Sequence, residues 1–374
     1  MPNLKTKETE IINLDGNKKK VVHITQSLSR GGAERLITEL GALSAKRYNV
    51  TVICQYNSID KEFEQKLKGA GARLIMMSKK KGFSLSAIIE LYKLLSKIKP
   101  DIIHTHIQSS AYAFLYYLFH SKVKKVHTIH TLPQTEFTKF HMFVQWLEYK
   151  FLNVVPVAVS DTVKLHTQRV YRLSGGRVKC VYNGINTEFF KPMHNNLKSD
   201  FTLINVANFS VWKRQCDIVK AMAKTDGNIK CIFAGDGGTK DKTQKLANRL
   251  GVYDRCLFLG RINSEVEVKN YLNKANAFIL TSEFEGTPIS IIEAYACGLP
   301  VIVTDVGGIR DLTDDGINGY LCKKGDIDDI AHKIMLLKND PSLCEKMSYN
   351  NLQKSKKFDI RKTCEEYFKI YEER

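Results

Sequence analysis

The sequence predicts an α/β protein with two Rossmann-like domains. Short apolar runs typical of strands alternate with amphipathic runs typical of helices over residues 20–183, and the alternation recurs over residues 201–359. Strands that alternate with helices form parallel sheets covered on both faces. Between the two regions, residues 184–200 contain Pro192 and a polar tract, which is typical of an interdomain linker.

The first domain is expected to follow a short N-terminal extension. Residues 1–19 are polar and charged, so we expect a flexible lead-in without a secretory signal. The strand 20–25 should lead through a glycine-containing loop into a helix that ends near residue 46. Further strands are expected at residues 50–55, 73–77, 101–105, 124–129, 155–159 and 178–181, and further helices at 60–69, 84–98, 108–120, 138–152 and 160–171.

The second domain repeats this pattern. Its strands are expected at residues 201–206, 229–234, 257–261, 276–280 and 301–303, and its helices at 289–297, 326–338 and 341–353, with a last helix at 360–372. The helix 289–297 stops at a Gly-Leu-Pro sequence, as helix C-termini often do. Residues 276–303 therefore form a βαβ unit. Its first loop lies at the carboxyl end of a strand, where open α/β sheets bind ligands.

Two carboxylates frame that loop and helix. Glu285 lies in the loop and Glu293 on the helix, and the backbone N–H groups of Ile289 and Ser290 open the helix between them. Free N–H groups at a helix N-terminus form an anion site. A diphosphate there, with a sugar held by each carboxylate, describes a nucleotide-sugar. The alternative is a solvated loop acid and a helix-dipole acid, which two isolated glutamates would favour.

The surrounding residues support the ligand site through a resemblance. The stretch EGTPISIIEAYACGLPVIVTDVGGIRDLTDDGINGYL resembles the donor-site signature of GT4-family retaining glycosyltransferases of the GT-B fold, with Glu285 and Glu293 as its E-x7-E pair. The resemblance implies two Rossmann-like domains that face each other across a cleft. It also implies that Glu285 and Gly286 contact the donor sugar, that Glu293 binds the ribose, and that residues 360–374 pack back on the first domain.

Further motifs in the first domain resemble the same family. SRGGAER, with Gly31 and Gly32, resembles the loop that closes on the donor diphosphate, and Arg35 would border the acceptor. His130 ends a strand; an isolated histidine there is more often structural, but the family carries one close to the transferred sugar. His104 and His106 also end a strand, and we interpret them as core or loop residues. Ser160 either faces the acceptor or caps a helix.

The second domain carries a cationic motif that differs from the family pattern. Lys213 and Arg214 resemble the basic pair that neutralises the diphosphate, with a solvated lysine as the alternative for Lys213. Asn208 occupies the position where the family usually has arginine. Arg214, Arg30 or Arg35 could compensate for that loss of charge.

The resemblance implies a mechanism. Lys213, the helix N-terminus and the Gly31-Gly32 loop would stabilise the leaving nucleoside diphosphate without a divalent metal or another cofactor. The retaining outcome implies attack on the same face of the sugar, with the departing phosphate accepting the acceptor's proton. His130, Lys213 and Glu285 are the expected catalytic residues, and domain closure is the expected gating step.

Composition limits the partners. The net charge of +18 indicates a polyanionic partner or a solvated basic surface, and no nucleic-acid-binding signature accompanies it. Residues 111–119 form the most apolar helix, followed by a lysine cluster, and this is either a core helix or an interfacial segment. We expect a cytoplasmic protein, attached peripherally to the inner face of the membrane. The nine cysteines show no disulfide or zinc pattern.

The expected activity is transfer of a sugar, most often from a UDP-linked donor in this family, to a glycan or lipid-linked acceptor of the cell surface. A nucleotide-sugar 2-epimerase with the same fold is one alternative, although its motifs fit the E-x7-E stretch poorly. A degenerate nucleotide-sugar-binding protein is the other, and Asn208 gives it slight support.

Overall fold

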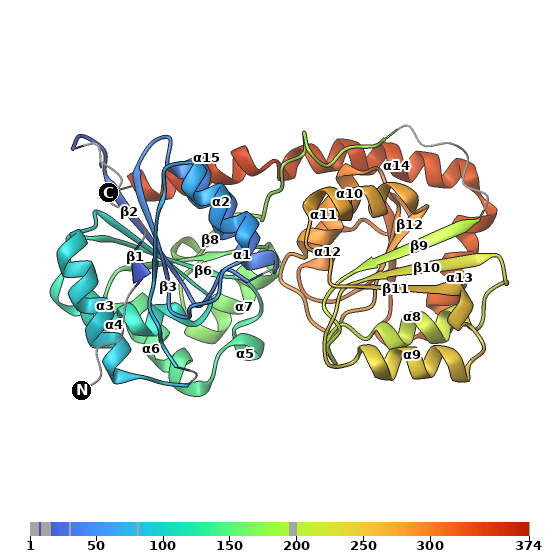
Figure 1. The fold of residues 1–374 in the computed structure, drawn as a ribbon, viewed down its shortest axis with the longest axis horizontal. Coiled ribbons are helices and arrows are strands. Elements are labelled where there is room, and N and C mark those ends of the chain that lie inside the picture. Colours follow the sequence, from blue (N-terminus) through green and yellow to red (C-terminus); the bar gives the residue numbers. More distant parts are fainter. Residues whose placement is uncertain (1–6, 9–15, 30, 81, 194–199, 374) are drawn as a thin grey trace. The chain divides into compact units, whose positions relative to one another are not determined.

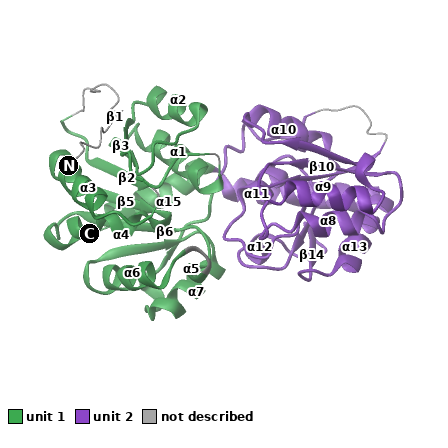
Figure 2. Cartoon of the chain, turned by 60° about the horizontal axis from the view of Figure 1, so that its bottom comes forward, with its two compact units in different colours: residues 1–183, 360–374 green, residues 184–359 purple. Residues whose placement is uncertain are grey.

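The computed structural model describes residues 7–8, 16–29, 31–80, 82–193 and 200–373. The chain divides into two compact units (Figure 2). Unit 1 comprises residues 1–183 together with 360–374, and unit 2 comprises residues 184–359. The chain therefore leaves unit 1 once and returns to it for its last described helix.

Unit 1 is built on an eight-stranded sheet in the order β1-β4-β3-β2-β5-β6-β7-β8. The strands are β1 (Lys7–Glu8), β2 (Lys20–Thr25), β3 (Asn49–Cys54), β4 (Arg73–Met76), β5 (Ile102–His106), β6 (Lys124–Ile129), β7 (Val154–Ala158) and β8 (Lys179–Cys180). All neighbours pair in parallel except β1, which pairs antiparallel with β4. The expected flexible lead-in 1–19 is thus wrong for Lys7 and Glu8, while residues 1–6 and 9–15 lie outside the described part.

Helices cover both faces of this sheet. They are α1 (Gly32–Ser44), α2 (Lys61–Gly69), α3 (Leu85–Ile98), α4 (Ser110–Phe119), α5 (Pro133–Glu136), α6 (Lys139–Phe151), α7 (Asp161–Tyr171) and α15 (Ile360–Glu372). The helices α3, α4, α6 and α7 share one apolar core on one face of the sheet. On the opposite side, α1 packs against both α2 and α15 (Figure 1). Tyr367 and Tyr371 of α15 are fully enclosed within unit 1.

Two helices of unit 1 differ from the expected ranges. The helix predicted at 108–120 begins as a 3₁₀ turn at Ile107–Ser109 before α4, because Ile107 has φ 54° and cannot continue a regular helix. The helix predicted at 138–152 is preceded by the separate one-turn helix α5. An extended Phe137 separates α5 from α6, and Thr138 caps α6 through its side chain.

Unit 2 is built on a six-stranded sheet in the order β11-β10-β9-β12-β13-β14, with all neighbours parallel. Its strands are β9 (Phe201–Val206), β10 (Ile229–Ala234), β11 (Cys256–Gly260), β12 (Ala277–Leu280), β13 (Val301–Thr304) and β14 (Gly319–Cys322), and its helices are α8 (Gln215–Met222), α9 (Lys240–Arg249), α10 (Glu265–Lys274), α11 (Ile289–Ala296), α12 (Ile309–Leu312), α13 (Ile327–Asn339) and α14 (Pro341–Ser355). The carboxyl ends of these parallel strands meet at one edge of the sheet.

The expected linker 184–200 is partly fixed to unit 2. Ile185 N donates to Phe358 O at 2.9 Å, and Thr187 Oγ1 donates to Asp359 Oδ2 at 2.5 Å. Residues 194–199 lie outside the described part. Within the described residues, no helix has both the length and the apolar character needed to cross a membrane.

Candidate functional site

The loop between β12 and α11 is held from two sides. Thr281 Oγ1 donates to Arg214 O at 3.0 Å, and Thr304 Oγ1 donates to Ser282 O at 2.6 Å. The first contact ties the loop to the segment before α8, and the second ties it to β13. A loop anchored in this way holds its side chains in fixed positions, as a binding site requires.

Glu285 and Lys213 meet in this loop although they are far apart in the sequence. Lys213 Nζ forms an ion pair with Glu285 Oε1, which also accepts a hydrogen bond from Ser282 Oγ at 2.5 Å. The Glu285 side chain is 10% exposed and that of Lys213 is 26% exposed. Both charged groups therefore have limited access to solvent, and each neutralises the charge of the other.

The turn at Gly307 and Gly308 packs against the backbone carbonyl group of Glu285. Gly307 has φ 51°, and a Cβ there would lie 2.0 Å from Glu285 O. Gly308 N donates to the same carbonyl at 3.1 Å. The backbone of Glu285 is thus fixed by a turn that admits no side chain at position 307.

The helix α11 begins four residues after Glu285 and carries the second glutamate, Glu293. Glu293 lies in the second turn of α11 and is 2% exposed. Gly286 and Ile289 are buried, while Ser290 is partly exposed in the first turn. The first N–H groups of a helix have no partner within the helix. One short segment of unit 2 therefore carries two carboxylates and a helix N-terminus with its positive dipole end, and Lys213 joins it from the segment before α8.

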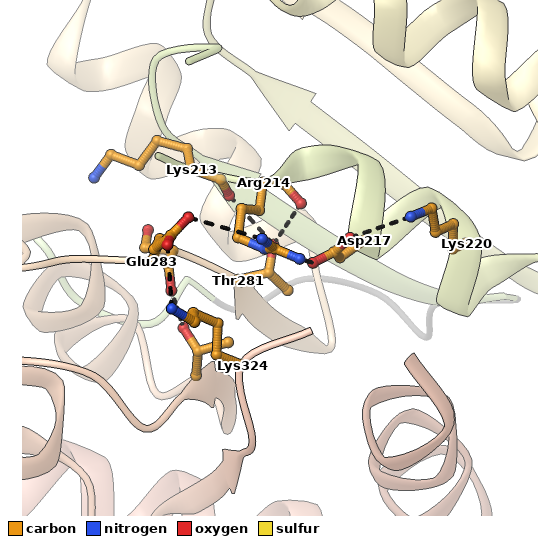
Figure 3. Close-up of polar contacts among 9 residues, drawn as sticks. Lys213, Arg214, Asp217, Lys220, Thr281, Glu283 and Lys324 are labelled. Atoms are coloured by element: carbon orange, nitrogen blue, oxygen red, sulfur yellow. Dashed lines mark hydrogen bonds and ion pairs between the residues drawn. The ribbon is translucent and has the colours of Figure 1, made fainter. Parts of the chain in front are cut away.

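Arg214 lies in a network of carboxylates (Figure 3). Its Nη2 lies 2.7 Å from Asp217 Oδ2 and its Nη1 lies 3.7 Å from Glu283 Oε2. Lys324 Nζ approaches Glu283 Oε1 at 3.1 Å, and Lys220 Nζ approaches Asp217 Oδ1 at 3.7 Å. Arg214 itself has φ 50° at the N-cap of α8. The guanidinium group thus joins α8 to the loop after β12.

The neighbouring strand ends are joined by close backbone contacts. Phe209 N donates to Asp236 O at 2.9 Å, and Gly235 N donates to Gly260 O at 2.8 Å. A Cβ at Gly235 would lie 2.0 Å from Ala207 O, so this strand end requires glycine. Asn208 has an exposed side chain, and its backbone oxygen accepts from Gln215 Nε2 at 3.0 Å.

The side chain of Glu34 lies against Gly31, the first glycine of the pair in unit 1. Gly31 is the N-cap of α1 in an extended conformation, and a Cβ there would lie 2.3 Å from Glu34 Oε2. Burial raises the pKa of the Glu34 carboxyl, and its hydrogen bond to a backbone N–H opposes that rise. Gly32 begins α1, and Arg35 N donates to Gly31 O at 3.0 Å. Arg30 lies outside the described residues.

Ser160 has the capping position that the sequence left as one of two interpretations. Its Oγ accepts a hydrogen bond from Val163 N at 3.2 Å at the start of α7. The side chain is fully buried. Its hydroxyl group therefore stabilises the helix N-terminus.

His130 is the end member of a chain of imidazoles. His130 Nε2 lies 3.4 Å from His106 Nδ1, and His106 Nε2 lies 3.2 Å from His23 Nδ1. His130 is partly buried, and His23 and His106 are fully buried. Burial lowers the pKa of His130 to about 4 and that of His23 to about 3. These histidines are therefore neutral near pH 7.

His104 belongs to the core beneath α15. Its Nδ1 lies 2.6 Å from the Tyr371 hydroxyl oxygen, and its Nε2 lies 2.7 Å from Thr128 Oγ1. Ring nitrogens of His23, His104 and His106 lie within 4.8 Å of one another, which makes them the one metal-compatible group among the described residues. Both nitrogens of His104 already have hydrogen-bond partners, so a metal would have to displace one of them.

Sequence reasoning did not identify the partners that organise this site. Asp217 follows Arg214 by three residues at the start of a helix, and that spacing was the available signal. Ser282 contacts Glu285 within the loop itself. Glu283 and Lys324 join the site through ion pairs between distant segments. No local pattern identifies such contacts.

The architecture of both units defines a class of fold. The structure of Anabaena HepE in complex with UDP and glucose aligns with a TM-score of 0.82 and 19% identity, covering 94% of this chain and 98% of that chain. This likeness shows that the chain has the GT-B fold, with two Rossmann-like units.

Sequence comparisons place the chain in a family of that class. The family model for glycosyl transferases group 1 matches residues 186–354, and the model for glycosyltransferase family 4 matches residues 30–189. The chain belongs to the GT4-type, group 1 glycosyltransferases.

Two curated relatives are similar to about half of this chain. A putative glycosyltransferase, EpsD of Bacillus subtilis, is 30% identical over 212 residues, covering 53% of this chain and 55% of the relative. The N-acetyl-alpha-D-glucosaminyl L-malate synthase of Bacillus anthracis is 34% identical over 180 residues, covering 46% of each. The chain thus spans about half the length of the curated relatives that it matches.

Proposed function

We propose that the protein is a retaining glycosyltransferase that transfers a hexose or N-acetylhexosamine from a nucleotide-sugar, UDP-linked, to a glycan or lipid-linked acceptor in cell-surface polysaccharide or glycolipid assembly. The observation that carries the proposal is the Lys213–Glu285 ion pair beside the N-terminus of α11. It combines a cation and helix N–H groups for a diphosphate with a carboxylate for sugar hydroxyls.

The names of similar proteins support the donor. HepE of Anabaena has been crystallised with UDP and glucose, and the Bacillus anthracis relative is named for an N-acetylglucosaminyl group. HepE has also been crystallised with UDP-glucose, which is a nucleotide-sugar.

Each residue of the unit 2 site has a proposed role. Lys213 stabilises the charge that develops on the leaving diphosphate, together with the first N–H groups of α11, Ile289 and Ser290. Glu285, fixed by Gly307, orients the hydroxyls of the donor sugar, and Gly286 beside it contacts the same sugar. Glu293 accepts hydrogen bonds from the ribose. Arg214 holds the loop through Asp217 and Glu283, and its contribution to diphosphate binding is indirect.

The unit 1 residues have roles that depend on the proposal. His130 contacts the sugar as a neutral imidazole, in keeping with its lowered pKa. The Gly31-Gly32 loop binds the diphosphate when the Glu34 carboxylate moves aside, and Arg35 lies on the acceptor side. The proposed reaction needs no metal, and the departing phosphate takes the acceptor's proton. We place the enzyme in the cytoplasm, peripherally on the inner face of the membrane.

The test is nucleotide release from UDP-, GDP- and ADP-sugars, with and without an extracted lipid-linked glycan fraction. The wild type should release one nucleotide in a manner stimulated by the acceptor fraction. Lys213→Met should lower turnover about 100-fold or more, since it removes a charge that acts in the transition state. Lys224→Met is the matched control, because Lys224 pairs with the exposed Asp328 and not with Glu285.

Three results would contradict the proposal. Unchanged turnover in Lys213→Met would remove the assigned role of that residue. Conversion of the nucleotide-sugar into an isomer without an acceptor would indicate an epimerase. Tight nucleotide binding that Glu293→Gln weakens, without release under any condition, would indicate a binding protein. The anomeric configuration of the product, determined by NMR, decides whether the reaction retains configuration.

A further inference from the structure

Unit 1 exposes a set of large apolar side chains on the helices that cover one side of its sheet. All five phenylalanines that are exposed among the described residues lie on or next to α3, α4 and α6, with exposures between 54% and 69%. We name this set the aromatic face; its members are Phe83, Leu85, Ile89, Leu118, Phe119, Phe140, Phe143 and Phe151. Clustered exposed apolar side chains mark an interaction site, whereas scattered ones do not.

Ring contacts connect the members of the aromatic face. The ring centroids of Phe83 and Phe140 lie 5.7 Å apart, which joins the start of α3 to the start of α6. The ring centroid of Trp146 lies 6.2 Å from that of Phe143 and 5.5 Å from that of Phe151, so these rings form one row along α6. The helix α4 packs against both α3 and α6. The aromatic face is therefore carried by one layer of adjacent helices (Figure 1).

The polarity of α6 is partly inverted relative to a helix that faces water, although Val144 and Tyr149 also face the core. Gln145 and Glu148 are buried at 1% and 0% exposure, while Phe140, Phe143 and Phe151 are exposed by more than half. Burial raises the pKa of the Glu148 carboxyl to about 8, so this inward side chain is mostly protonated at neutral pH. Surface helices normally place apolar residues inward and charged ones outward. The outward side of α6 is thus suited to an apolar environment.

Lysines surround the apolar side chains. Residues 79–99, 110–125 and 137–152 contain eleven lysines and two acidic residues, Glu90 and Glu148. Among the lysines that the structure describes, the exposed ones of this set are Lys80, Lys93, Lys97, Lys99, Lys122, Lys139 and Lys150. Exposed aromatic rings flanked by lysine side chains are typical of segments that lie in the interface of an anionic membrane.

We propose that the aromatic face docks on an anionic lipid bilayer, with its phenylalanines in the boundary between headgroups and acyl chains and its lysines at the lipid phosphates. The proposal deepens the proposed function, since a lipid-linked acceptor would be presented at that surface. A symmetric contact with a second copy would bring two sets of lysines together, and this repulsion disfavours a dimer through this face.

The first experiment is co-sedimentation of the full chain with lipid vesicles. Binding should be strong to equimolar phosphatidylcholine and phosphatidylglycerol and weak to phosphatidylcholine alone. Phe143→Ser/Phe151→Ser should lower the partition coefficient at least about tenfold, since each phenylalanine loses burial in lipid. Lys139→Gln/Lys150→Gln should lower it about fivefold per lysine at low salt. Leu257→Ser/Val266→Ser, which changes exposed apolar residues of unit 2, is the matched control.

The second experiment uses the two tryptophans as reporters. Trp146 lies between two rings of the aromatic face, and Trp212 lies in unit 2. In Trp212→Phe, lipids with brominated acyl chains should quench Trp146, and in Trp146→Phe they should quench Trp212 much less.

The outcomes separate this proposal from the proposed function. Absence of vesicle binding at low salt, equal binding of the phenylalanine variant, or preferential quenching of Trp212 would each overturn the docking proposal. Self-association that is lost in Phe143→Ser/Phe151→Ser, without vesicle binding, would assign the face to a second copy. Binding of an acidic protein in place of vesicles would also overturn it. Vesicle binding requires no donor, so loss of nucleotide release leaves the docking test unaffected.

Discussion

Gly307 determines where Glu285 lies, although it belongs to a different segment. Its φ of 51° is unfavourable for other residues, and its Cα position faces the Glu285 carbonyl oxygen. Any side chain at position 307 must therefore displace the loop that carries the proposed sugar-binding carboxylate.

Gly307→Ala should lower the free energy of unfolding of unit 2 by about 2–4 kcal/mol, because strain in the left-handed region adds to the clash. Donor turnover should also fall. The measurement is urea unfolding followed by Trp212 fluorescence in a Trp146→Phe background. Gly316→Ala is the control, since Gly316 has φ 72° with nothing within 4 Å of a Cβ. In Gly316→Ala the free energy of unfolding of unit 2 should fall by only about 1–2 kcal/mol. Equal losses in the two variants would contradict the role of the close contact.

The sequence predicted which residue types the site contains but not how they are paired. Glu285, Ile289 and Glu293 lie in one continuous segment, so a single strand–loop–helix pattern placed them together. The pairing of Lys213 with Glu285 arises from the sheet order, in which β12 pairs directly with β9. That order depends on packing between distant segments, which local periodicity does not encode.

At the scale of elements, several buried histidines lie on the central strands of unit 1 or at their ends. Eight of the ten histidines lie in residues 1–183. Burial lowers the pKa of His23 and His127 to about 3 and that of His130 to about 4, whereas an unfolded chain has histidine pKa values of about 6.5. Between these values the unfolded state binds more protons than the folded state.

Unit 1 should therefore lose stability as the pH falls. The contribution of these histidines is fully present above about pH 6.5 and is lost progressively toward pH 4, with about 1 kcal/mol per histidine for each pH unit between 6 and 5. The measurement is urea unfolding of Trp212→Phe, followed by Trp146, at pH 7.5, 6.5 and 5.5. Unit 2, followed by Trp212 in Trp146→Phe, should depend less on pH. If the free energies of unfolding of the two units depended equally on pH, this explanation would be ruled out.

Most elements of the fold were predictable because they are strongly periodic. The strands β2, β6, β9 and β10 have the expected bounds. The strand β1 was missed because two residues carry no periodic signal, and its pairing with β4 is a tertiary contact. The start of α4 was predicted two residues early, because residues 108 and 109 belong to a 3₁₀ turn that opens at Ile107 with a positive φ, which a β-branched residue rarely adopts.

At the scale of the whole molecule, the last described helix belongs to the first unit. Cys364, Tyr367, Phe368 and Tyr371 of α15 are at most 6% exposed, and its tyrosines bond to Thr128 and His104. The helix therefore completes the core of unit 1.

Deletion of residues 360–374 should destabilise unit 1 selectively, since it exposes this core and leaves buried polar groups without partners. In urea unfolding, the midpoint concentration reported by Trp146 fluorescence should fall sharply, while the midpoint reported by Trp212 fluorescence should change little. Glu366→Ala/Lys369→Ala, which removes an exposed ion pair of the same helix, should have almost no effect. An equal fall of both midpoints would contradict the assignment of α15 to unit 1.

The return of the chain to unit 1 also affects how the protein forms during translation. A ribosome synthesises all of unit 2 before it reaches α15, so the nascent second unit has its complete sequence first. Until α15 emerges, the nascent first unit exposes the side of its sheet that carries His104 and Thr128. Unit 1 therefore completes its core only with the segment that follows the whole of unit 2, and its uncovered sheet is exposed to misassembly until then.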